Sequence, residues 1–441
     1  MSVNASKDTS FLERTFKLNE HKTNAKTEVI AGITTFMTMA YILIVNPLIL
    51  SDAGMDFGAV FTATALSAVI ATLIMALYAN LPFALAPGMG LNAFFAYTVV
   101  LGMGYPWEFA LTAVLLEGIL FILLSFFNVR EAIIDSIPMN LKHAVSVGIG
   151  LFIAFIGLAN AGVVVSGGGT IIGLGEITAA GPMLAIIGII ITGFLLAKGV
   201  KGALLLGILI TTVIGIPMGQ TVLPEGLKFI SAPPSLSPIF FKFDFSNIFT
   251  LDMVIVLFSF LFVDIFDTVG TLVGVSSKAD MLDKDGKVPN VKRALLADAI
   301  GTTAGACLGT STVTTYVESA AGVSEGGRTG LTALSTAGMF AIALFLSPLF
   351  IMIPGAATAP ALVIVGLFMM SPIKKIDLDD ITEAIPAFLT IIMMPFAYSI
   401  AEGIVFGMVS YVVINILAGK LKKVSPVMII LSIAFIAKFL I

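Results

Sequence analysis

Residues 83–97 read FALAPGMGLNAFFAY, and they lie inside a long apolar region where a membrane helix would be expected to run without interruption. The stretch nevertheless places Pro87, Gly88 and Gly90 close together and follows them with Asn92. Proline and glycine both disfavour a continuous helix, and a simple kink at Pro87 is one explanation. Irregular backbone inside a bilayer persists only where it is buried in protein or lines a cavity. The stretch therefore also indicates a candidate site.

The composition is typical of a protein that crosses a membrane many times. Of the 441 residues, 58% are hydrophobic and 11% are charged, and the mean hydropathy is +1.08. A soluble protein of this size carries much more charge, so a soluble globular class is excluded. Apolar runs of about 20 residues, the length that spans a bilayer as a helix, recur along the chain. We therefore predict an all-α polytopic membrane protein.

The apolar runs predict about 14 transmembrane spans, divided equally between the two halves of the chain. A last apolar stretch, residues 425–441, is short for a span and either crosses the membrane or lies along its surface. The expected spans are 27–50, 57–79, 80–101, 106–127, 138–161, 181–198 and 199–217 in the first half, and 251–275, 291–309, 310–324, 328–352, 356–371, 385–401 and 402–419 in the second half.

The distribution of Lys and Arg predicts the orientation. If the N-terminus is cytoplasmic, all 23 basic residues lie in cytoplasmic segments or at cytoplasmic span ends except Lys228, Lys242 and Lys438. Positive charge is retained on the cytoplasmic side of membrane proteins. We therefore expect a multi-pass protein of the cell membrane with a cytoplasmic N-terminus.

The two halves of the chain carry matching sequence features. Gly150-Leu151-Phe152 begins 12 residues after Pro138 (150 − 138), and Gly366-Leu367-Phe368 begins 12 residues after Pro354 (366 − 354). Chance similarity between apolar segments is the alternative. An odd number of spans in each half makes the halves enter from opposite sides, which gives an inverted repeat of the kind common in secondary transporters.

The third expected span of the second half is also interrupted. Residues 309–327 read GTSTVTTYVESAAGVSEGG, which is too polar and glycine-rich for an ordinary span. We expect short extended pieces at 83–86 and 312–315, each followed by a half-helix that begins near Met89 or near Tyr316. Interrupted segments at matching places in two repeats indicate a transport site.

Three carboxylates are expected at membrane depth. Asp264 and Asp267 are three residues apart in the eighth span and share one helix face, and Glu318 follows the second interruption. An isolated charge there costs at least ~2.5 kcal/mol, so these acids need partners, water or protons. For Asp267, bracing of helix packing through Thr268 or Thr271 is an equally good interpretation.

Two further acids lie inside expected spans. Glu117 is in the fourth span and Asp298 in the ninth. The sequence leaves open whether each is structural or part of a proton path.

The chain resembles the nucleobase–cation symporters, specifically the AzgA-like purine permeases of the nucleobase/ascorbate transporter family. The resemblance extends from about Lys17 to about Leu417. It rests on TEVIAGITTFMTMAYILIVNP from Thr27, APGMGLNAFFAY, DIFDTVGTLVGV, RALLADAIGTTAGACLGTSTVTTYVESAAGV and AEGIVFGMVSY.

The resemblance implies two inverted seven-span repeats with a core of spans 1–4 and 8–11 and a gate of spans 5–7 and 12–14. Spans 3 and 10 would be broken by short extended segments. The expected boundaries are an N-terminal cytoplasmic segment at 1–26, core halves at 27–127 and 251–352, gate halves at 128–217 and 353–419, an extracellular loop at 218–250 and a C-terminal segment at 420–441.

The resemblance also implies a substrate site and a transport mode. Substrate would lie between spans 3 and 10, facing span 8, and would be imported by proton symport as hypoxanthine, guanine, adenine or a related purine. Carboxylates accept the N–H groups of a purine edge well. The implied substrate-binding residues are Gly88, Met89, Asn92, Asp264, Tyr316 and Glu318, and the implied proton-coupling residues are Asp264, Asp267 and Glu318.

Other functions fit the sequence less well. An anion transporter of the same architecture would favour a basic or neutral lining, whereas this one has acids. An intramembrane metal-dependent enzyme would need a second acidic cluster and basic residues, which the spans lack. A channel suits paired broken helices less well than alternating access does. We expect a purine, a proton and the lipid bilayer as partners, with no nucleic acid, cofactor or metal, and a homodimer stays open.

Overall fold

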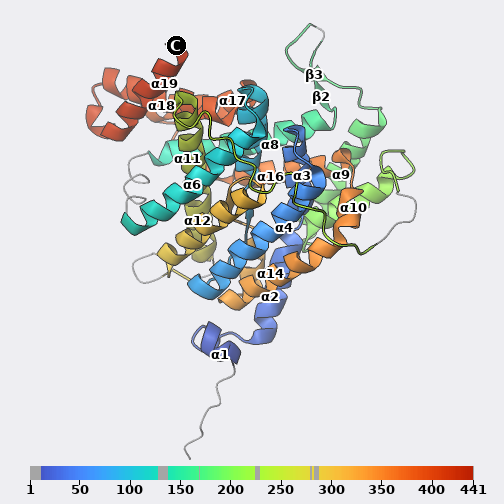
Figure 1. Cartoon of the computed structure of the whole chain (residues 1–441). Coiled ribbons are helices and arrows are strands. Elements are labelled where there is room, and N and C mark those ends of the chain that lie inside the picture. Colours follow the sequence, from blue (N-terminus) through green and yellow to red (C-terminus); the bar gives the residue numbers. More distant parts are fainter. Residues whose placement is uncertain are drawn as a thin grey trace, which may run out of the picture.

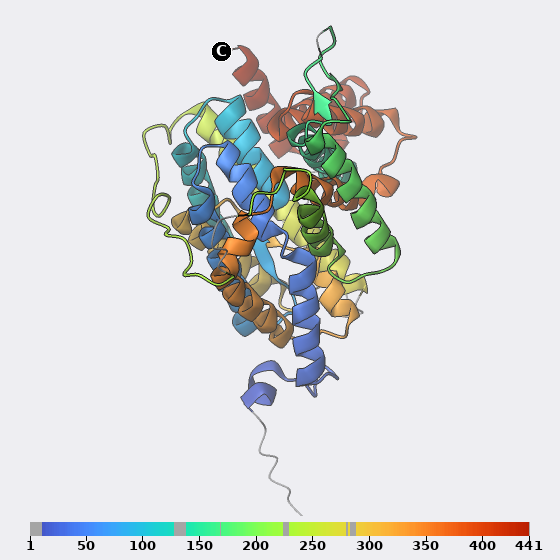
Figure 2. The ribbon, with the colours of Figure 1, turned by 90° about the vertical axis from the view of Figure 1, so that its right-hand side faces the viewer.

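The computed structural model describes residues 11–127, 138–167, 169–223, 229–278, 281–282 and 288–440. Helices dominate these residues, and the short strands form two small antiparallel pairs. Figures 1 and 2 show α1 (Phe11–Phe16) at one end of the molecule, opposite the hairpin of β2 (Val164–Val165) and β3 (Gly173–Leu174).

The helices of the first half match the expected spans closely, and the third span is interrupted as expected. The first span is divided in two at Ala40 and Tyr41. The elements are α2 (Ala25–Met39), α3 (Ile42–Asp52), α4 (Phe57–Ile74) with a π-helical extension over Met75–Ala79, α6 (Trp107–Phe127), α8 (Met139–Asn160), α9 (Ala180–Ala197) and α10 (Ala203–Gly215).

The second half follows the same order. Its final helix lies beyond the expected spans. The elements are α11 (Leu251–Lys278), α12 (Val291–Leu308), α14 (Gly330–Ala343), α15 (Ser347–Ile351), α16 (Gly355–Met369), α17 (Ile381–Phe396), α18 (Ile400–Leu417) and α19 (Pro426–Leu440).

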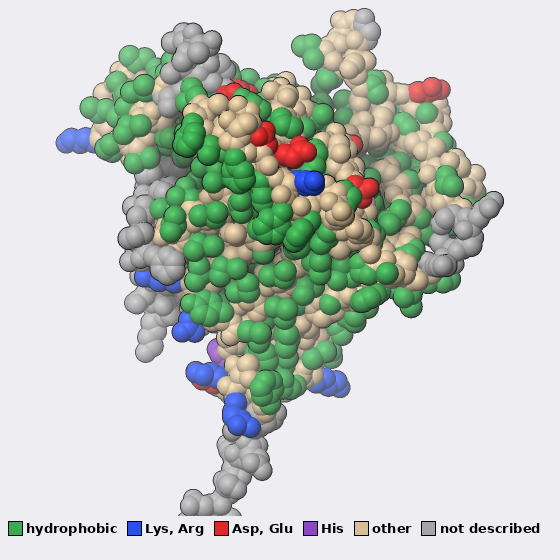
Figure 3. Space-filling model, viewed as in Figure 1, with side chains coloured by type: hydrophobic (Ala, Val, Ile, Leu, Met, Phe, Trp, Pro, Cys, Tyr) green, Lys and Arg blue, Asp and Glu red, His purple; other side chains and the backbone are tan. Residues whose placement is uncertain are grey.

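The helix lengths agree with the expected number of spans. Within the described ranges, nine helices are long and apolar enough to cross a membrane, and three shorter apolar helices cover Met89–Gly102, Ala203–Gly215 and Ile381–Phe396. Helix α12 and the broken segment after it account for the other two expected spans. Figure 3 shows a broad hydrophobic surface on one face, with Lys and Arg gathered mainly toward the end near α1. This is the surface expected of a polytopic membrane protein.

The helices pack into two groups. Helices α2, α4, α6, α11, α12 and α14 pack on one another, and α8, α9, α10, α16, α17 and α18 pack on one another. In Figure 1, α6, α12, α4 and α14 run side by side. The groups involve the spans expected in the core and the gate. The boundaries and the separate roles of these domains stay predictions.

The matching glycines of the two repeats meet in space. A Cβ added to Gly150 on α8 would lie 2.5 Å from the backbone oxygen of Gly366 on α16, and a Cβ on Gly366 would meet the oxygen of Gly150. A two-fold relation between the halves makes equivalent residues contact each other reciprocally, as these two glycines do. Both positions therefore need glycine so that the two helices can approach.

The two interrupted segments cross each other as a short antiparallel ribbon. Strand β1 (Leu85–Pro87) pairs with β4 (Val313–Thr315), with Ala86 opposite Thr314. The first half-helix begins at Met89, as predicted, with α5 (Met89–Ala93) continuing as a π-helix over Phe94–Gly102.

The second half-helix differs in its start. Helix α13 (Ser319–Ser324) begins three residues after Tyr316, because a turn over residues 316–318 comes first. The backbone N–H of Ser319 donates to the carbonyl of Tyr316 at 3.1 Å. Glu318 consequently occupies the residue just before the helix.

Two threonines complete the hydrogen bonding of this ribbon. The Thr72 hydroxyl on α4 accepts from the Leu85 N–H at 3.0 Å and donates to the Leu85 carbonyl at 3.1 Å. The Thr302 hydroxyl on α12 does the same for Val313, at 3.2 and 2.9 Å. Extended backbone can exist at membrane depth only if its polar groups are paired within the protein. Here each strand pairs with the other and with a threonine on its outer edge.

Helix α19 packs against helices of both groups. The Ser432 hydroxyl donates to the Met408 carbonyl of α18 at 3.5 Å, and the Phe435 ring lies 5.9 Å from that of Phe258 on α11. Its 15 residues extend about 22 Å, which is shorter than a bilayer core of about 30 Å.

Candidate functional site

Asp264 is fully buried on α11 and lies next to a hydroxyl network that reaches the ribbon. The Thr268 hydroxyl, one helical turn away, lies 3.5 Å from Asp264 Oδ1 and donates to Asp298 Oδ1 at 2.9 Å. It is also 2.7 Å from the Thr314 hydroxyl on β4. A hydroxyl carries one proton, so Thr314 donates to Thr268 when Thr268 donates to Asp298. This network ties α11 and α12 to the ribbon.

Glu318 is held by the first span of the other repeat. The Tyr41 hydroxyl, at the break between α2 and α3, donates to Glu318 Oε1 at 2.6 Å. The Thr38 hydroxyl lies 3.4 Å from the Glu318 backbone oxygen. A short hydrogen bond from tyrosine fixes one carboxylate oxygen, and a carboxylate has the capacity to accept further hydrogen bonds from a ligand.

The first half-helix contributes a buried amide. Asn92 on α5 is fully buried, and its Oδ1 accepts a short hydrogen bond from the Ser311 hydroxyl. Its Nδ2 has no hydrogen-bond partner among the described residues. An unsatisfied buried donor is costly, so this amide is a candidate ligand donor.

Gly88 and Tyr316 hold the ribbon together at its two ends. The Gly88 N–H donates to the Thr312 carbonyl at 2.9 Å, and a Cβ on Gly88 would lie 2.5 Å from Thr314 Cγ2. The Tyr316 hydroxyl makes a short hydrogen bond to the Pro87 carbonyl, and its N–H donates to the Ala84 carbonyl at 3.0 Å.

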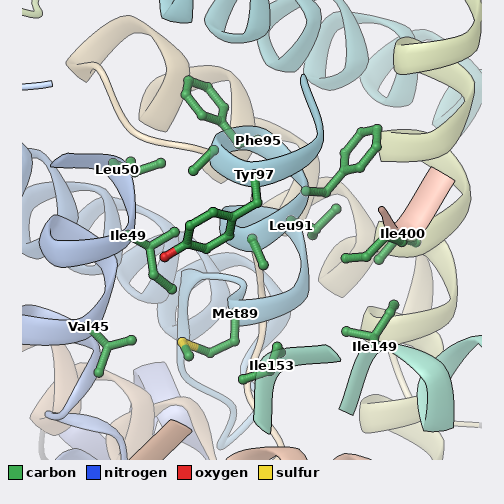
Figure 4. Packing of buried hydrophobic residues seen from close by; sticks show 14 of the residues in the cluster. Val45, Ile49, Leu50, Met89, Leu91, Phe95, Tyr97, Ile149, Ile153 and Ile400 are labelled. Atoms are coloured by element: carbon green, nitrogen blue, oxygen red, sulfur yellow. The ribbon is translucent and has the colours of Figure 1, made fainter. Parts of the chain in front are cut away.

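Met89 lies where the two helix groups meet. Figure 4 shows Met89 and Leu91 between residues of α3, such as Val45, and residues of α8, such as Ile149 and Ile153. Met89 is buried, with 5% of its surface exposed. A ligand in contact with Met89 would therefore lie between the groups.

The structure brings most of the expected site residues to the ribbon. Gly88, Met89, Asn92 and Tyr316 are part of it or adjoin it, and Glu318 follows it directly. Asp264 connects to it through Thr268. No hydrogen bond involves Asp267 among those in the described part of the chain, so the suggested bracing through Thr268 or Thr271 finds no support there. The roles of all these residues stay predictions.

An aromatic pair flanks the same region. Phe94 follows α5 and Phe260 lies on α11, and their rings meet edge to face with centroids 4.8 Å apart. Both side chains are fully buried. The pair packs the first half-helix against the helix that carries Asp264.

Sequence reasoning missed two residues that make long-range contacts, one at the site and one at a neighbouring helix. Tyr41 contacts Glu318, and the only signal was a polar tyrosine in the middle of the first apolar run. Glu28 on α2 is fully buried and accepts from the N–H groups of Arg328 at 2.9 Å and Thr332 at 3.2 Å. Its carboxylate thus binds the start of α14, a contact that no local pattern indicates.

The chain matches known permeases over most of its length. The sequence pattern of the Permease family (Xan_ur_permease) covers residues 26–406. The adenine permease AdeP of Escherichia coli is 47% identical over 427 residues, which cover 97% of this chain and 95% of that protein. The guanine/hypoxanthine permease PbuO of Bacillus subtilis is 44% identical over 425 residues, which cover 95% of this chain and 98% of that protein.

A solved structure has the same fold at low sequence identity. The transmembrane domain of a cyanobacterium bicarbonate transporter, BicA, superposes with a TM-score of 0.63 at 18% identity, covering 86% of this chain and 97% of that domain. The likeness confirms the predicted fold of two inverted seven-span repeats but carries no information on substrate. The relatives are permeases, so the chain is a multi-pass membrane transporter and not an enzyme. The chain belongs to the Permease family, and its resemblance to the AzgA-like nucleobase transporters is confirmed.

Proposed function

We propose that this chain imports purine nucleobases as a proton symporter that works by alternating access. The observation that carries the proposal is the β1–β4 ribbon, with Asp264 and Glu318 beside it. Acids and amide donors placed together at membrane depth suit a flat polar ring without charge. The relatives described above, an adenine permease and a guanine/hypoxanthine permease, support this substrate class.

In the proposed complex, the base lies between the ribbon and α11. Glu318 and Asp264 accept N–H groups from the edge of the base. The amide of Asn92 and the first N–H groups of α5, which have no acceptor within their own helix, donate to ring nitrogens or carbonyls. Tyr316 and Met89 enclose the ring.

Proton coupling requires an acid whose protonation differs between the substrate-bound and the substrate-free transporter. Asp264, Asp267 and Glu318 are the candidates because they lie at membrane depth, where an unpaired charge is costly. A neutral base brings no charge of its own. We propose that proton uptake by one of these acids accompanies binding and that proton loss accompanies release.

Alternating access would be a relative movement of the two helix groups. Two polar bridges join the groups at opposite ends of the expected spans. At one end, the Asn160 amide on α8 donates to the Tyr97 hydroxyl at 3.1 Å, and Tyr97 donates to Asp52 at 2.6 Å. At the other end, Lys201 pairs with Glu325 at 2.6 Å. With a cytoplasmic N-terminus, the first bridge faces outward and the second faces inward. Each would have to open in turn.

Uptake into proteoliposomes tests the proposal. Labelled hypoxanthine should accumulate, and unlabelled hypoxanthine, guanine and adenine should compete, whereas uracil and bicarbonate should not. The panel is measured at two pH values. Failure of every purine to compete would reject the substrate class.

The coupling ion is tested separately. A protonophore should abolish accumulation while a sodium gradient is maintained. Accumulation that ignores the protonophore but collapses with the sodium gradient would replace the proton by sodium.

A further inference from the structure

The segment that forms β4 is anchored by the hydroxyl groups of four residues, Thr310, Ser311, Thr312 and Thr314. The Thr310 hydroxyl contacts the Asn46 amide at 2.9 Å, and the Ser311 hydroxyl contacts Asn92. Thr312 and Thr314 bond to groups on α6 and α11. Residues 310–315 all have at most 1% of their surface exposed. Buried hydroxyls are normally paired within the protein, and four of the five here are; the Thr315 hydroxyl has no partner among the described residues.

Glu117 supplies one of these partners from the fourth span. It is fully buried on α6, and the Thr312 hydroxyl donates to its Oε2 at 2.5 Å. The contact requires only an oxygen acceptor at this position, and either a carboxyl group or a side-chain amide provides one.

Asp298, in the ninth span, is a second acidic partner of β4, and it acts through the Thr268 hydroxyl. It is fully buried on α12 and accepts from Thr268 at 2.9 Å, and Thr268 lies 2.7 Å from Thr314. The same threonine lies near Asp264. Asp298 therefore fixes the orientation of the hydroxyl that joins α11 to β4.

A ribbon of two short strands is marginal without such support. An isolated two-stranded pair is barely stable even in water, and β1 and β4 have three residues each. Tyr316 and Glu318 follow β4 directly, so a shift of the strand displaces both. Anchors on the strand thus control the position of the residues proposed to bind the base.

We infer that Glu117 and Asp298 are positioning residues that hold β4 through the hydroxyls of Thr312 and Thr268, and that neither carries the transported proton. The inference rests on the proposed transport function. It decides between the two interpretations, structural or proton path, that the sequence leaves open for these acids.

Paired substitutions separate the two interpretations. Glu117→Gln and Asp298→Asn keep an oxygen acceptor and cannot carry a proton, whereas Glu117→Met and Asp298→Leu remove the acceptor. We expect the amide variants to retain hypoxanthine uptake within about twofold. The apolar variants should raise the KM about tenfold, which corresponds to about 1.4 kcal/mol. Protein that merely folds less well would lower Vmax and leave the KM unchanged.

A double-mutant cycle on thermal unfolding tests the contact without transport. Glu117→Met and Thr312→Val should each lower the melting temperature, and the double variant should lose little more than the worse single variant. Thr192→Val is the matched control. Thr192 is buried on α9, and its hydroxyl has no hydrogen-bond partner within the described residues, so its loss should leave uptake unchanged.

Two outcomes would overturn the inference. If Glu117→Gln or Asp298→Asn abolishes uptake at normal melting temperature, the acid itself is required and a proton path is the better account. If the losses of melting temperature caused by Glu117→Met and Thr312→Val add up in the double variant, the contact between these residues does not hold the strand. If the wild-type protein takes up no purine, the proposed function fails, and the cycle still decides the positioning role.

Discussion

The two crossing segments are built alike, each with a short strand followed by a half-helix, but they differ in side-chain chemistry. Residues 83–93 are rich in glycine, proline and apolar side chains, and Asn92 is their one polar side chain. Residues 309–324 are rich in hydroxyls and carry Glu318. Each contributes a three-residue strand and a half-helix. The inverted repeat thus determines the path of the chain but leaves each half free to supply a different part of the site.

The difference follows from how closely the strands approach. Gly88 has no side chain, so the Thr314 methyl group can occupy the space where its Cβ would be. The first segment therefore offers close approach and backbone amides, and the second offers the acid and the hydroxyl anchors. Substitutions in each segment test whether the two segments contribute to the site in these different ways.

The largest expected effect comes from the acids. Glu318→Gln or Asp264→Asn should abolish purine accumulation while the protein remains in the membrane. A hydrogen bond to a charged group is worth about 1.5–3 kcal/mol, or roughly 10- to 150-fold in affinity, and an amide cannot exchange a proton. Asn92→Ala, in the other segment, should weaken binding and leave coupling intact. Normal accumulation by either acid variant would remove that residue from the site.

Gly88→Ala should have the next largest effect. The added methyl would lie 2.5 Å from Thr314 Cγ2, and β-branched side chains have little freedom to move away. Overpacking of this kind costs about 1–3 kcal/mol, so we expect the KM for hypoxanthine to rise by roughly 5- to 150-fold. Gly338→Ala on α14 is the control, since nothing lies within 4 Å of an added Cβ there. An equal KM for the Gly88→Ala and Gly338→Ala variants would contradict the close approach of Gly88 to Thr314.

The two edge threonines should behave alike despite the different chemistry of their strands. Thr72→Val removes the partner of both polar backbone groups of Leu85, and Thr302→Val does so for Val313. Leaving such groups unsatisfied costs about 1–3 kcal/mol in stability. Thermal unfolding measures the loss, and the serine variants should restore most of it. A loss confined to one half would show that the ribbon is not supported symmetrically.

The smallest effect concerns the start of α17, which differs from its counterpart α9. Asp380 caps α17 by accepting from the Thr382 N–H at 3.0 Å, whereas Ala179 gives α9 no side-chain cap. The hydrogen bond from Lys420, followed by those from Thr382, holds the pKa of Asp380 below its usual value. A lowered folded-state pKa stabilises the protein above the unfolded pKa of about 3.9, and this contribution is lost as the pH falls through the folded value.

Asp380→Asn should therefore lower the melting temperature slightly at pH 7, by no more than about 2 °C, because the side chain is partly exposed to solvent, which screens its charge. The difference from the wild type should shrink as the pH falls below about 4. Ala179→Ser in the first half should have the opposite sign, because serine caps a helix where alanine cannot. A difference that persists unchanged at low pH would exclude the charge of Asp380 as its cause.

The sequence by itself determined the membrane class, the spans, the repeat and the place of both interruptions. Apolar run length and glycine and proline content report directly on helices in a bilayer, so these features need no partner to be recognised. The start of α5 at Met89 was predicted for the same reason. The start of α13 was predicted three residues early, because the turn over residues 316–318 depends on contacts across the ribbon.

Only the tertiary structure decided which residues meet. Glu318 contacts Tyr41 across 277 positions, and Thr312 contacts Glu117 across 195 positions. The pairing of β1 with β4 likewise joins residues that are far apart in the chain. Local patterns report on a residue's own helix or strand, whereas hydrogen-bond partners at membrane depth are set by how the two repeats pack against each other.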